Sequence, residues 1–298
     1  SHNPIIYNGL KFVSKKGLFI NKEETEKVKS HIKEVSTIEK NNSGNYIENF
    51  DLPKEHIDHV LSFVNLEEIR KKHFRILTDM INGSACVMDP YFFEKINAEF
   101  IPINNIPNGK FAHKPEPLAE NLKEVSEKAK LENIDVGFVH DPDADRLVII
   151  DEHGNIVLEE HTLALSIENI LSKNPKNKIV VNLSTSMTNK EIADKYDSKC
   201  YYSKIGDVYV VEKMLAEDAI IGGEGNGGVI YPKINTARDG FAGMALILEL
   251  MTERNKKISE LVSDLPKYFI KKEKWDIKDK NLTEIYTTFV WRSDIAPG

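Results

Sequence analysis

Short apolar runs alternate with longer amphipathic stretches through most of the chain. Residues 136–139 and 147–150 are rich in Val, Ile and Phe, and residues 75–80, 179–183 and 219–221 have a similar character. Brief runs of this composition indicate buried strands. The stretches between them carry apolar residues at helical spacing, so strands and helices are expected to follow one another in turn.

The helical stretches and one further strand complete this pattern. Helices are predicted near residues 22–35, 54–63, 118–130, 162–172, 188–196, 207–215 and 239–251, and a strand at residues 199–203. Strands separated by helices are typical of a mostly parallel sheet with helices covering its faces. The sequence therefore predicts an α/β protein with two consecutive units of similar size. The polar run at residues 41–45 predicts a linker before them.

Composition narrows the function classes. The chain has 298 residues, of which 41% are hydrophobic and 29% are charged, and its net charge is −7. Basic and acidic residues are interspersed, which argues against a nucleic-acid groove or a membrane surface as partner. No apolar run approaches the ~20 residues of a membrane span, and no signal peptide is expected. Cys86 and Cys200 lie far apart without metal-ligand spacing, which favours a reducing, cytoplasmic location.

Three carboxylates at alternate positions mark the loop between the runs at 136–139 and 147–150. They belong to Asp141, Asp143 and Asp145. Like charges this close raise one another's pKa unless a cation lies among them. Oxygen ligands at this density suit Mg²⁺ or Ca²⁺ better than zinc. The loop therefore predicts a divalent-metal site.

Three other interpretations of this loop compete with that prediction. An EF-hand would use the three aspartates and Glu152, but its sixth position requires Gly and is Arg146 here, and a strand pattern follows. A phosphatase of the haloacid-dehalogenase type also places two aspartates two residues apart, but it requires Thr or Val at the position of Asp145. A solvated acidic turn needs no cation, but the enclosing apolar runs favour an ordered loop.

A glycine-rich turn follows the strand predicted at 219–221. Glu224 and Asn226 are the only side chains within residues 222–228. Gly permits close backbone approach to a ligand, and ligands of open α/β sheets bind beyond the carboxyl ends of the strands. A carboxylate and an amide two residues apart can bind neighbouring sugar hydroxyls. The alternative is a flexible linker, although the flanking strands leave little slack, and the chain has no Walker motif for a nucleotide.

The first residues of the chain form a further candidate loop. The sequence opens with Ser1-His2-Asn3-Pro4, and Tyr7-Asn8-Gly9 and Lys11 follow. Pro and Asn-Gly indicate turns, so Ser1 is expected on an ordered loop with Lys11 a short distance further along. By itself the Ser-His-Asn-Pro stretch is weak evidence for a functional loop, and a turn or capping role is the default for any one of its residues.

These three stretches, in this order and spacing, resemble the α-D-phosphohexomutase superfamily of phosphoglucomutases, phosphomannomutases and phosphoglucosamine mutases. Residues 1–11 resemble its phosphoserine loop, residues 141–146 its metal loop and residues 223–227 its sugar-binding loop. Arg238-Asp239-Gly240 after Tyr231-Pro232 also fits. The resemblance covers nearly the whole chain, and it implies consecutive three-layer α/β domains with mixed, mostly parallel sheets.

The resemblance implies an intramolecular phosphotransferase that interconverts hexose or hexosamine 6-phosphates and 1-phosphates. It implies a phosphate on Ser1, a bisphosphorylated sugar intermediate, and one Mg²⁺ held by Ser1 and the three aspartates. Lys11 and His2 are the implied proton carriers, although Lys11 would need a cationic or desolvated setting to act as a base.

The remaining implied roles concern charge and sugar recognition. Arg146 would offset phosphate charge, or else form a structural salt bridge to the aspartates. Glu224, Asn226 and Gly227 would bind the sugar in both of its orientations. His140, next to the metal loop, is expected to pack rather than to take part in chemistry.

Four positions depart from the common family pattern. Pro142 and Ala144 stand where glycines are common in the metal loop, and Asn226 and Gly228 stand where many members have Ser and His. The Glu-Gly-Asn-Gly-Gly form is similar to archaeal-type and Bacteroidetes-type members, which are often assigned as phosphoglucosamine mutases. It therefore favours glucosamine phosphate over mannose or glucose phosphate.

Members of the superfamily have four domains. The resemblance places the end of the first at residues 1–45, the second at 46–158, the third at 159–266 and the start of the fourth at 267–298. The chain is thus expected to be truncated at both ends, to lack the loop for the distal phosphate, and to turn over poorly alone. A non-catalytic module that binds metal or sugar phosphate is the alternative from another class, and phosphate incorporation at Ser1 distinguishes the two.

Overall fold

The computed structural model describes residues 10–34 and 47–268. No helix in these ranges is long and apolar enough to cross a membrane. The elements follow in the order α1 (Lys22–Glu34), α2 (Leu52–Leu61), α3 (Leu66–Lys72), β1 (Arg75–Asp79), α4 (Ala85–Lys95), β2 (Glu99–Ile103), η1 (Ala119–Asn121), α5 (Lys123–Glu132), β3 (Val136–His140), β4 (Leu147–Ile150), α6 (Glu159–Lys173), β5 (Lys178–Asn182), α7 (Thr188–Lys195), β6 (Lys199–Ser203), α8 (Asp207–Glu217), β7 (Ile221–Glu224), β8 (Gly228–Ile230), α9 (Gly240–Arg254) and α10 (Ile258–Ser263).

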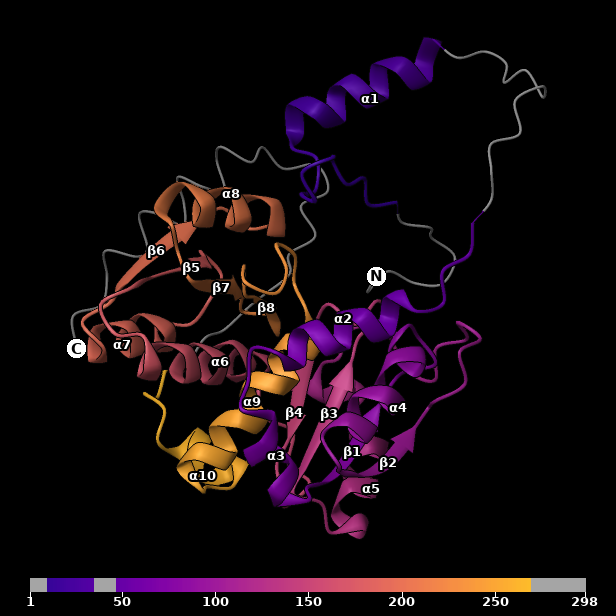
Figure 1. Ribbon diagram of the computed structural model, residues 1–298, viewed down its shortest axis with the longest axis vertical. Coiled ribbons are helices and arrows are strands. Elements are labelled where there is room, and N and C mark those ends of the chain that lie inside the picture. Colours follow the sequence, from indigo (N-terminus) through magenta and orange to yellow (C-terminus); the bar gives the residue numbers. More distant parts are fainter. Residues whose placement is uncertain (1–9, 35–46, 269–298) are drawn as a thin grey trace, which may run out of the picture. The chain divides into compact units, whose positions relative to one another are not determined.

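The strands form two four-stranded sheets (Figure 1). The first has the order β2-β1-β3-β4, and the second has the order β6-β5-β7-β8. In each sheet three strands are parallel, and the last strand, β4 or β8, pairs antiparallel to its neighbour. Parallel neighbours need long crossover connections, which the helices provide, whereas antiparallel neighbours can be joined by short loops. The predicted α/β fold with mixed, mostly parallel sheets is confirmed, and the two units share one topology.

Alternate residues of each strand pack on opposite faces of the sheet. In β5, Ile179 and Val181 join a cluster that includes residues of α6 and α9, whereas Val180 packs with Val210 and Met214 of α8. The first sheet has a corresponding separate cluster, which includes residues of α5. Each sheet is therefore covered by helices on both faces.

Helices α6 and α9 connect the two sheets through one apolar core. They pack against each other, and each contacts both β4 of the first sheet and β8 of the second (Figure 1). Both helices are buried along most of their length. The loop with the three aspartates, residues 141–146 and hereafter the acidic loop, leads into β4. The glycine-rich turn, residues 222–228, leads into β8, so the same two helices support both loops.

The structure corrects several predicted elements. The strand expected at residues 219–221 is β7, Ile221–Glu224, and the helix expected at 118–130 is divided into η1 and α5. Four elements, α3, α4, β2 and α10, were not predicted. Pro90 inside α4 and Pro102 inside β2 explain two of these, because proline weakens the sequence pattern of both kinds of element. The expected linker at 41–45 lies outside the described residues.

Candidate active site

The acidic loop connects β3 to β4, two buried antiparallel strands. Asp141 Oδ1 accepts hydrogen bonds from the backbone N–H groups of Asp145 and Arg146, at 3.0 and 3.1 Å. Ala144 adopts the left-handed backbone conformation, with φ of 56°. A tight hairpin therefore carries the loop. Because no helix flanks it, the EF-hand interpretation is excluded.

The three carboxylates of this loop converge. One oxygen from each of Asp141, Asp143 and Asp145 lies within 4.8 Å of the other two. Burial, together with the neighbouring carboxylates, raises the pKa of Asp141 to about 7. Burial opposes ionisation of Asp143 as well, but hydrogen bonding to Asp141 and the charge of Lys11 hold the pKa of Asp143 below its ordinary value. The shift of Asp141 thus reflects its burial first and the negative charges of Asp145 and Asp143 second.

The donor set fits a small divalent cation. Asp141 Oδ2 and Asp145 Oδ1 are buried and have no hydrogen-bond partner among the described residues. A buried carboxylate oxygen without a partner is costly. Mg²⁺ takes oxygen ligands at about 2.1 Å, so ligands on opposite sides of it stand about 4 Å apart. The spacing of the triad matches this requirement, and a bound cation would satisfy both oxygens.

Lys11 reaches the triad from the N-terminal segment. Its Nζ lies 3.1 Å from Asp143 Oδ2 and 2.8 Å from Asp145 Oδ2. Partial burial lowers the pKa of Lys11, but hydrogen bonds and charge from the two carboxylates outweigh it and raise the pKa above its ordinary value. These contacts are the opposite of the cationic setting that a basic Lys11 would need. In this arrangement Lys11 is protonated, and its two salt bridges make it a weaker acid than a free lysine.

Glu224 ends β7, and its side chain is almost wholly buried. Its Oε1 accepts hydrogen bonds from Asn182 Nδ2 at 2.7 Å and from the Gly206 backbone N–H at 2.9 Å. Its Oε2 accepts one from Arg238 Nη1 at 2.7 Å. A carboxylate has about four acceptor positions. Three donors therefore fix its orientation and leave room for one further donor, such as a hydroxyl.

The glycine-rich turn lies directly against the start of β4. Gly227 has a φ of 87°, and its carbonyl accepts a hydrogen bond from the Leu147 N–H at 3.1 Å. A Cβ at Gly227 would stand 2.4 Å from Leu147 O, so only glycine fits there. Half-buried Asn226 accepts a hydrogen bond from the Gly228 N–H through Oδ1 at 3.3 Å. The turn is therefore ordered by these contacts, against the linker interpretation.

Arg238 is a site residue to which the motifs alone give no role. Its Nη2 lies 2.7 Å from Asp145 Oδ2, and its Nη1 lies 2.7 Å from Glu224 Oε2. Asp207 Oδ2 lies 3.6 Å from Nη2. One guanidinium thus joins the acidic loop of the first sheet to the glycine-rich turn of the second. The Arg-Asp-Gly triplet was the available signal, but its spacing does not reveal which carboxylates the side chain meets.

The N-terminus of α9 also contacts the acidic loop. The Gly240 N–H donates to Ala144 O at 3.0 Å, and a Cβ at Gly240 would stand 2.7 Å from that oxygen. Asp239 caps the helix by accepting hydrogen bonds from Phe241 N and Ala242 N. The partial positive charge of a helix N-terminus favours nearby carboxylates. α9 therefore supports the acidic loop both sterically and electrostatically.

Four further predicted residues have different outcomes. Arg146 is buried, and its Nε lies 3.9 Å from Asp145 Oδ1, within reach of an ion pair. His140 is wholly buried and stacks on Phe241, with the ring centroids 5.2 Å apart. Ser1 and His2 lie outside the described residues. The structure thus brings Lys11, the acidic triad and the glycine-rich turn together, with Arg238 at their junction.

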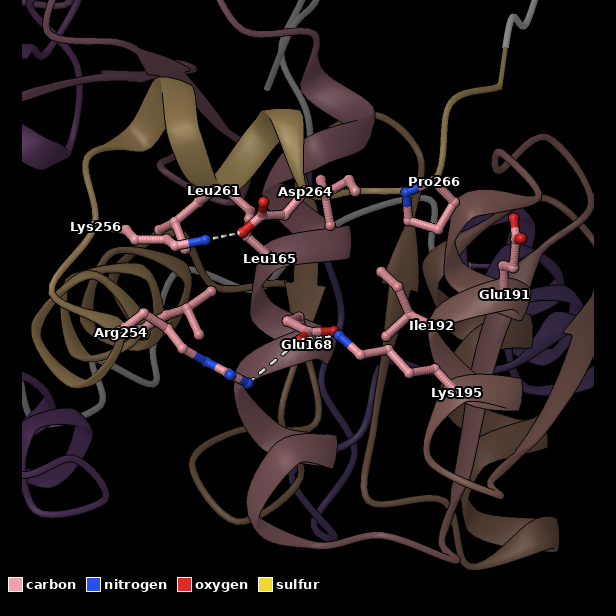
Figure 2. A pocket seen from close by; sticks show the side chains of 12 residues that line it. Leu165, Glu168, Glu191, Ile192, Lys195, Arg254, Lys256, Leu261, Asp264 and Pro266 are labelled. Atoms are coloured by element: carbon pink, nitrogen blue, oxygen red, sulfur yellow. Dashed lines mark hydrogen bonds and ion pairs between the residues drawn. The ribbon is translucent and has the colours of Figure 1, made fainter.

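The described residues form one pocket beside this junction and another away from it. One, of about 320 Å³, is lined by Lys11, by apolar side chains of the N-terminal segment, and by Asp207 of α8. The other, of about 550 Å³, lies between α6, α7, α9 and α10 (Figure 2). Ion pairs between Arg254 and Glu168 and between Lys256 and Asp264 border the second one. It contains no residue of the two loops and is separate from the candidate site.

Comparison with known families agrees with the fold. Three models described as phosphoglucomutase/phosphomannomutase, alpha/beta/alpha domains I, II and III, match residues 1–39, 54–154 and 159–269. Together they account for most of the chain. The chain belongs to the phosphoglucomutase/phosphomannomutase family, within the α-D-phosphohexomutase superfamily.

Individual relatives are similar over most of the chain. A phosphoglucosamine/phosphogalactosamine mutase of Sulfurisphaera tokodaii is 33% identical over 97% of the chain, and a phosphoglucomutase/phosphomannomutase of Thermococcus kodakarensis is 35% identical over 90%. The crystal structure of a family protein from Burkholderia thailandensis superposes with a TM-score of 0.76 at 26% identity, covering 89% of the chain and 57% of that protein. The chain spans 66% and 59% of the lengths of the first two relatives.

Proposed function

We propose that the chain is the catalytic core of a phosphohexomutase. Such an enzyme moves a phosphoryl group between the 1- and 6-oxygens of a hexose or hexosamine phosphate through a phosphoserine, here Ser1. The observation that carries the proposal is the junction of the acidic triad, Lys11 and the Glu224 turn through one guanidinium. Phosphoryl transfer depends mainly on charge neutralisation and alignment, and this junction offers both.

The acidic triad is the proposed metal site. Asp141, Asp143 and Asp145 would hold one Mg²⁺ together with the Ser1 phosphate, and the bound ion would supply Lewis-acid polarisation of the phosphoryl group. Lys11 would donate a proton to Ser1 Oγ as the phosphoryl group leaves only once a bound cation has taken its carboxylate partners, because the salt bridges make Lys11 a weaker acid. His2 is then the candidate acceptor for the proton of the attacking sugar hydroxyl.

The glycine-rich turn is the proposed sugar site. Glu224 has one acceptor position left after its three hydrogen bonds, which suits a sugar hydroxyl. Asn226 and the backbone at Gly227 would complete the contacts. Arg146, buried beside Asp145, would offset negative charge on the phosphate.

Glucosamine phosphate is the substrate we favour. The turn has the Glu-Gly-Asn-Gly-Gly form, and the Sulfurisphaera relative is named for glucosamine and galactosamine phosphates. Glucose and mannose phosphates are the alternatives, in line with the name of the Thermococcus relative. We further assign residues 46–158 and 159–266 to the second and third domains of such an enzyme, with 1–45 and 267–298 belonging to the first and fourth. Sparse cysteine use supports a cytoplasmic location.

Phosphate incorporation at Ser1 tests the proposal. The chain is incubated with glucose 1,6-bisphosphate and Mg²⁺, and its N-terminal peptide is analysed by mass spectrometry. We expect one phosphoryl group on Ser1 and none in Ser1→Ala. Asp143→Asn should reduce both incorporation and Mg²⁺ affinity measured by titration calorimetry. Asp218→Asn is the matched control, because Asp218 is an exposed C-cap with a φ of 55° that Asn tolerates equally well.

The outcomes separate the two classes of function. Mg²⁺ binding without incorporation at Ser1 would overturn the mutase proposal and favour a non-catalytic binding module. If Asp143→Asn binds Mg²⁺ as well as the wild type does, the assignment of the triad as the metal site is wrong.

A further inference from the structure

The guanidinium of Arg238 occupies an unusual position between the two loops. Its two terminal nitrogens each lie 2.7 Å from a different carboxylate, Asp145 on the first sheet and Glu224 on the second. The side chains of all three residues are largely buried, with exposures of 9%, 12% and 4%. Because desolvation strengthens charge-assisted hydrogen bonds, these two contacts restrict the orientation of both carboxylates.

Each contact leaves one side of the carboxylate available for function. Arg238 and Lys11 both bind Asp145 Oδ2, while Asp145 Oδ1 is buried and has no hydrogen-bond partner among the described residues. Glu224 keeps one acceptor position beyond its three hydrogen bonds. Arg238 therefore holds each carboxylate through one oxygen. Asp145 Oδ1 stays available for a cation, and Glu224 keeps one acceptor position for a further donor.

Gly228 provides the space that this arrangement needs. A Cβ at Gly228 would stand 2.3 Å from Arg238 Cδ and 2.9 Å from Arg238 Cγ. The aliphatic part of Arg238 thus lies directly over Gly228, at the start of β8. Arg238 can adopt this position only because residue 228 has no side chain.

We propose that Arg238 is a positioning residue that couples the acidic triad to the glycine-rich turn, so that cation binding at the triad strengthens sugar-phosphate binding at Glu224. The inference rests on the proposed function, since it takes a divalent cation and a hexosamine phosphate as the two ligands. Ordering Asp145 around a cation restrains the guanidinium, and the restrained guanidinium restrains Glu224. A ligand that meets an already ordered carboxylate loses less conformational entropy on binding.

The planar guanidinium, with its two terminal nitrogens, makes the role specific to arginine. A guanidinium can present two separate N–H groups to two carboxylates at once, whereas a lysine ammonium is a single point charge. Arg238→Lys therefore keeps the charge but loses the simultaneous contact. Arg238→Met keeps most of the apolar volume over Gly228 and loses both contacts.

Two measurements on the full chain test the coupling. The first is the Mg²⁺ affinity with and without glucosamine 6-phosphate, and the reciprocal affinity, by titration calorimetry. Thermodynamic linkage requires that Mg²⁺ raise the affinity for the sugar phosphate by the same factor by which the sugar phosphate raises the affinity for Mg²⁺. Typical factors are about 5- to 150-fold. The second is amide hydrogen exchange in residues 221–231, which Mg²⁺ alone should slow in the wild type. Arg254→Met is the matched control, because Arg254 pairs with Glu168 at the other end of α9.

The expected results distinguish coupling from simple structural support. In Arg238→Met and Arg238→Lys, Mg²⁺ affinity should fall about 10- to 100-fold, as for other residues that orient metal ligands. In both variants Mg²⁺ should no longer slow exchange in residues 221–231, while Arg254→Met should behave as the wild type.

Failure of the inference and failure of the proposed function give different results. If the wild type binds both ligands but neither affects the affinity for the other, and exchange at the turn ignores Mg²⁺, the inference is wrong and the proposed function stands. If the wild type binds neither ligand, both are wrong. The wild-type measurements decide this even if a variant does not fold.

Discussion

Ala144 is the residue in the acidic loop whose backbone is strained. Its φ of 56° lies in the left-handed region, which costs a residue with a Cβ about 1 kcal/mol. The Ala144 carbonyl must point toward the Gly240 N–H, 3.0 Å away, so the conformation is fixed by α9.

Ala144→Gly should therefore stabilise the protein. We expect a gain of about 1 kcal/mol, reduced somewhat by the greater freedom of glycine in the unfolded chain. Thermal and urea unfolding in EDTA provide the measurement. Ala216→Gly, at an exposed position of α8, is the control and should lose about 1 kcal/mol. If Ala144→Gly lowered the free energy of unfolding as Ala216→Gly does, the left-handed backbone of Ala144 would not be a source of strain.

At the residue scale the sequence predicted most of the candidate site but not its connections. The alternating aspartates and the isolated Glu224 stand out because their neighbours are apolar strands or glycines. Lys11 was expected near the loop, but its salt bridges to two carboxylates, and hence its protonated state, were not. Arg238 was missed because its partners come from two sheets, and no local spacing encodes a contact across 93 residues.

At the scale of elements, one histidine ties a long connection to the end of β1. His113 Nε2 lies 3.0 Å from Oδ2 of Asp79, which is wholly buried. Oδ1 of the same carboxylate accepts hydrogen bonds from Ile81 N and Asn104 Nδ2. The contacts hold the segment between β2 and η1 against the first sheet. Burial lowers the pKa of His113, but the hydrogen bond and charge of Asp79, together with the hydrogen bond to the Lys114 carbonyl, raise the pKa above its ordinary value.

The stability contributed by His113 should depend on pH. A raised pKa in the folded state means that the contribution is complete below the unfolded pKa of about 6.5 and is lost as pH rises through the folded pKa. Thermal unfolding between pH 5.5 and 9 should show this decline in the wild type. His113→Gln should remove part of the decline, whereas His31→Gln on exposed α1 should not. An unchanged pH profile in His113→Gln would contradict the assignment.

Prediction of whole elements succeeded where the hydrophobic pattern was regular. α6, α9, β3 and β5 combine length or β-branched composition with burial, so tertiary packing and local preference agree. β2 was missed because its five residues include Pro102 and are only partly buried. Proline tolerates an outer strand, where the missing N–H is not needed, so the position in the sheet compensates for the poor local preference.

At the scale of the molecule, the two sheets share their packing helices. Residues of β1, β3 and β4 and residues of β5, β7 and β8 belong to one apolar cluster with α6 and α9. A domain boundary drawn from the sequence between the two units therefore does not separate two independent cores. Unfolding of one sheet would expose the helices that cover the other.

Leu246→Ala in α9 should weaken both sheets together. Leu246 is wholly buried, and removing such a side chain costs about 2 to 5 kcal/mol. The slowest-exchanging amides of β3 and of β5 should lose protection by the same free energy, measured by hydrogen exchange. Leu131→Ala on α5, where the side chain is 85% exposed, should change neither. Loss of protection in β5 alone would show that the sheets unfold separately.

The outer strands of the two sheets differ in their protection against aggregation. Among the described residues, β2 pairs only with β1 and β6 only with β5. An open strand edge is a template for another extended chain. Pro102 interrupts the edge of β2, whereas β6 has no proline and relies on Lys199 and Lys204 at its two ends. In crowded or partly unfolded samples, self-association would begin at β6, and salt would promote it by screening these lysines.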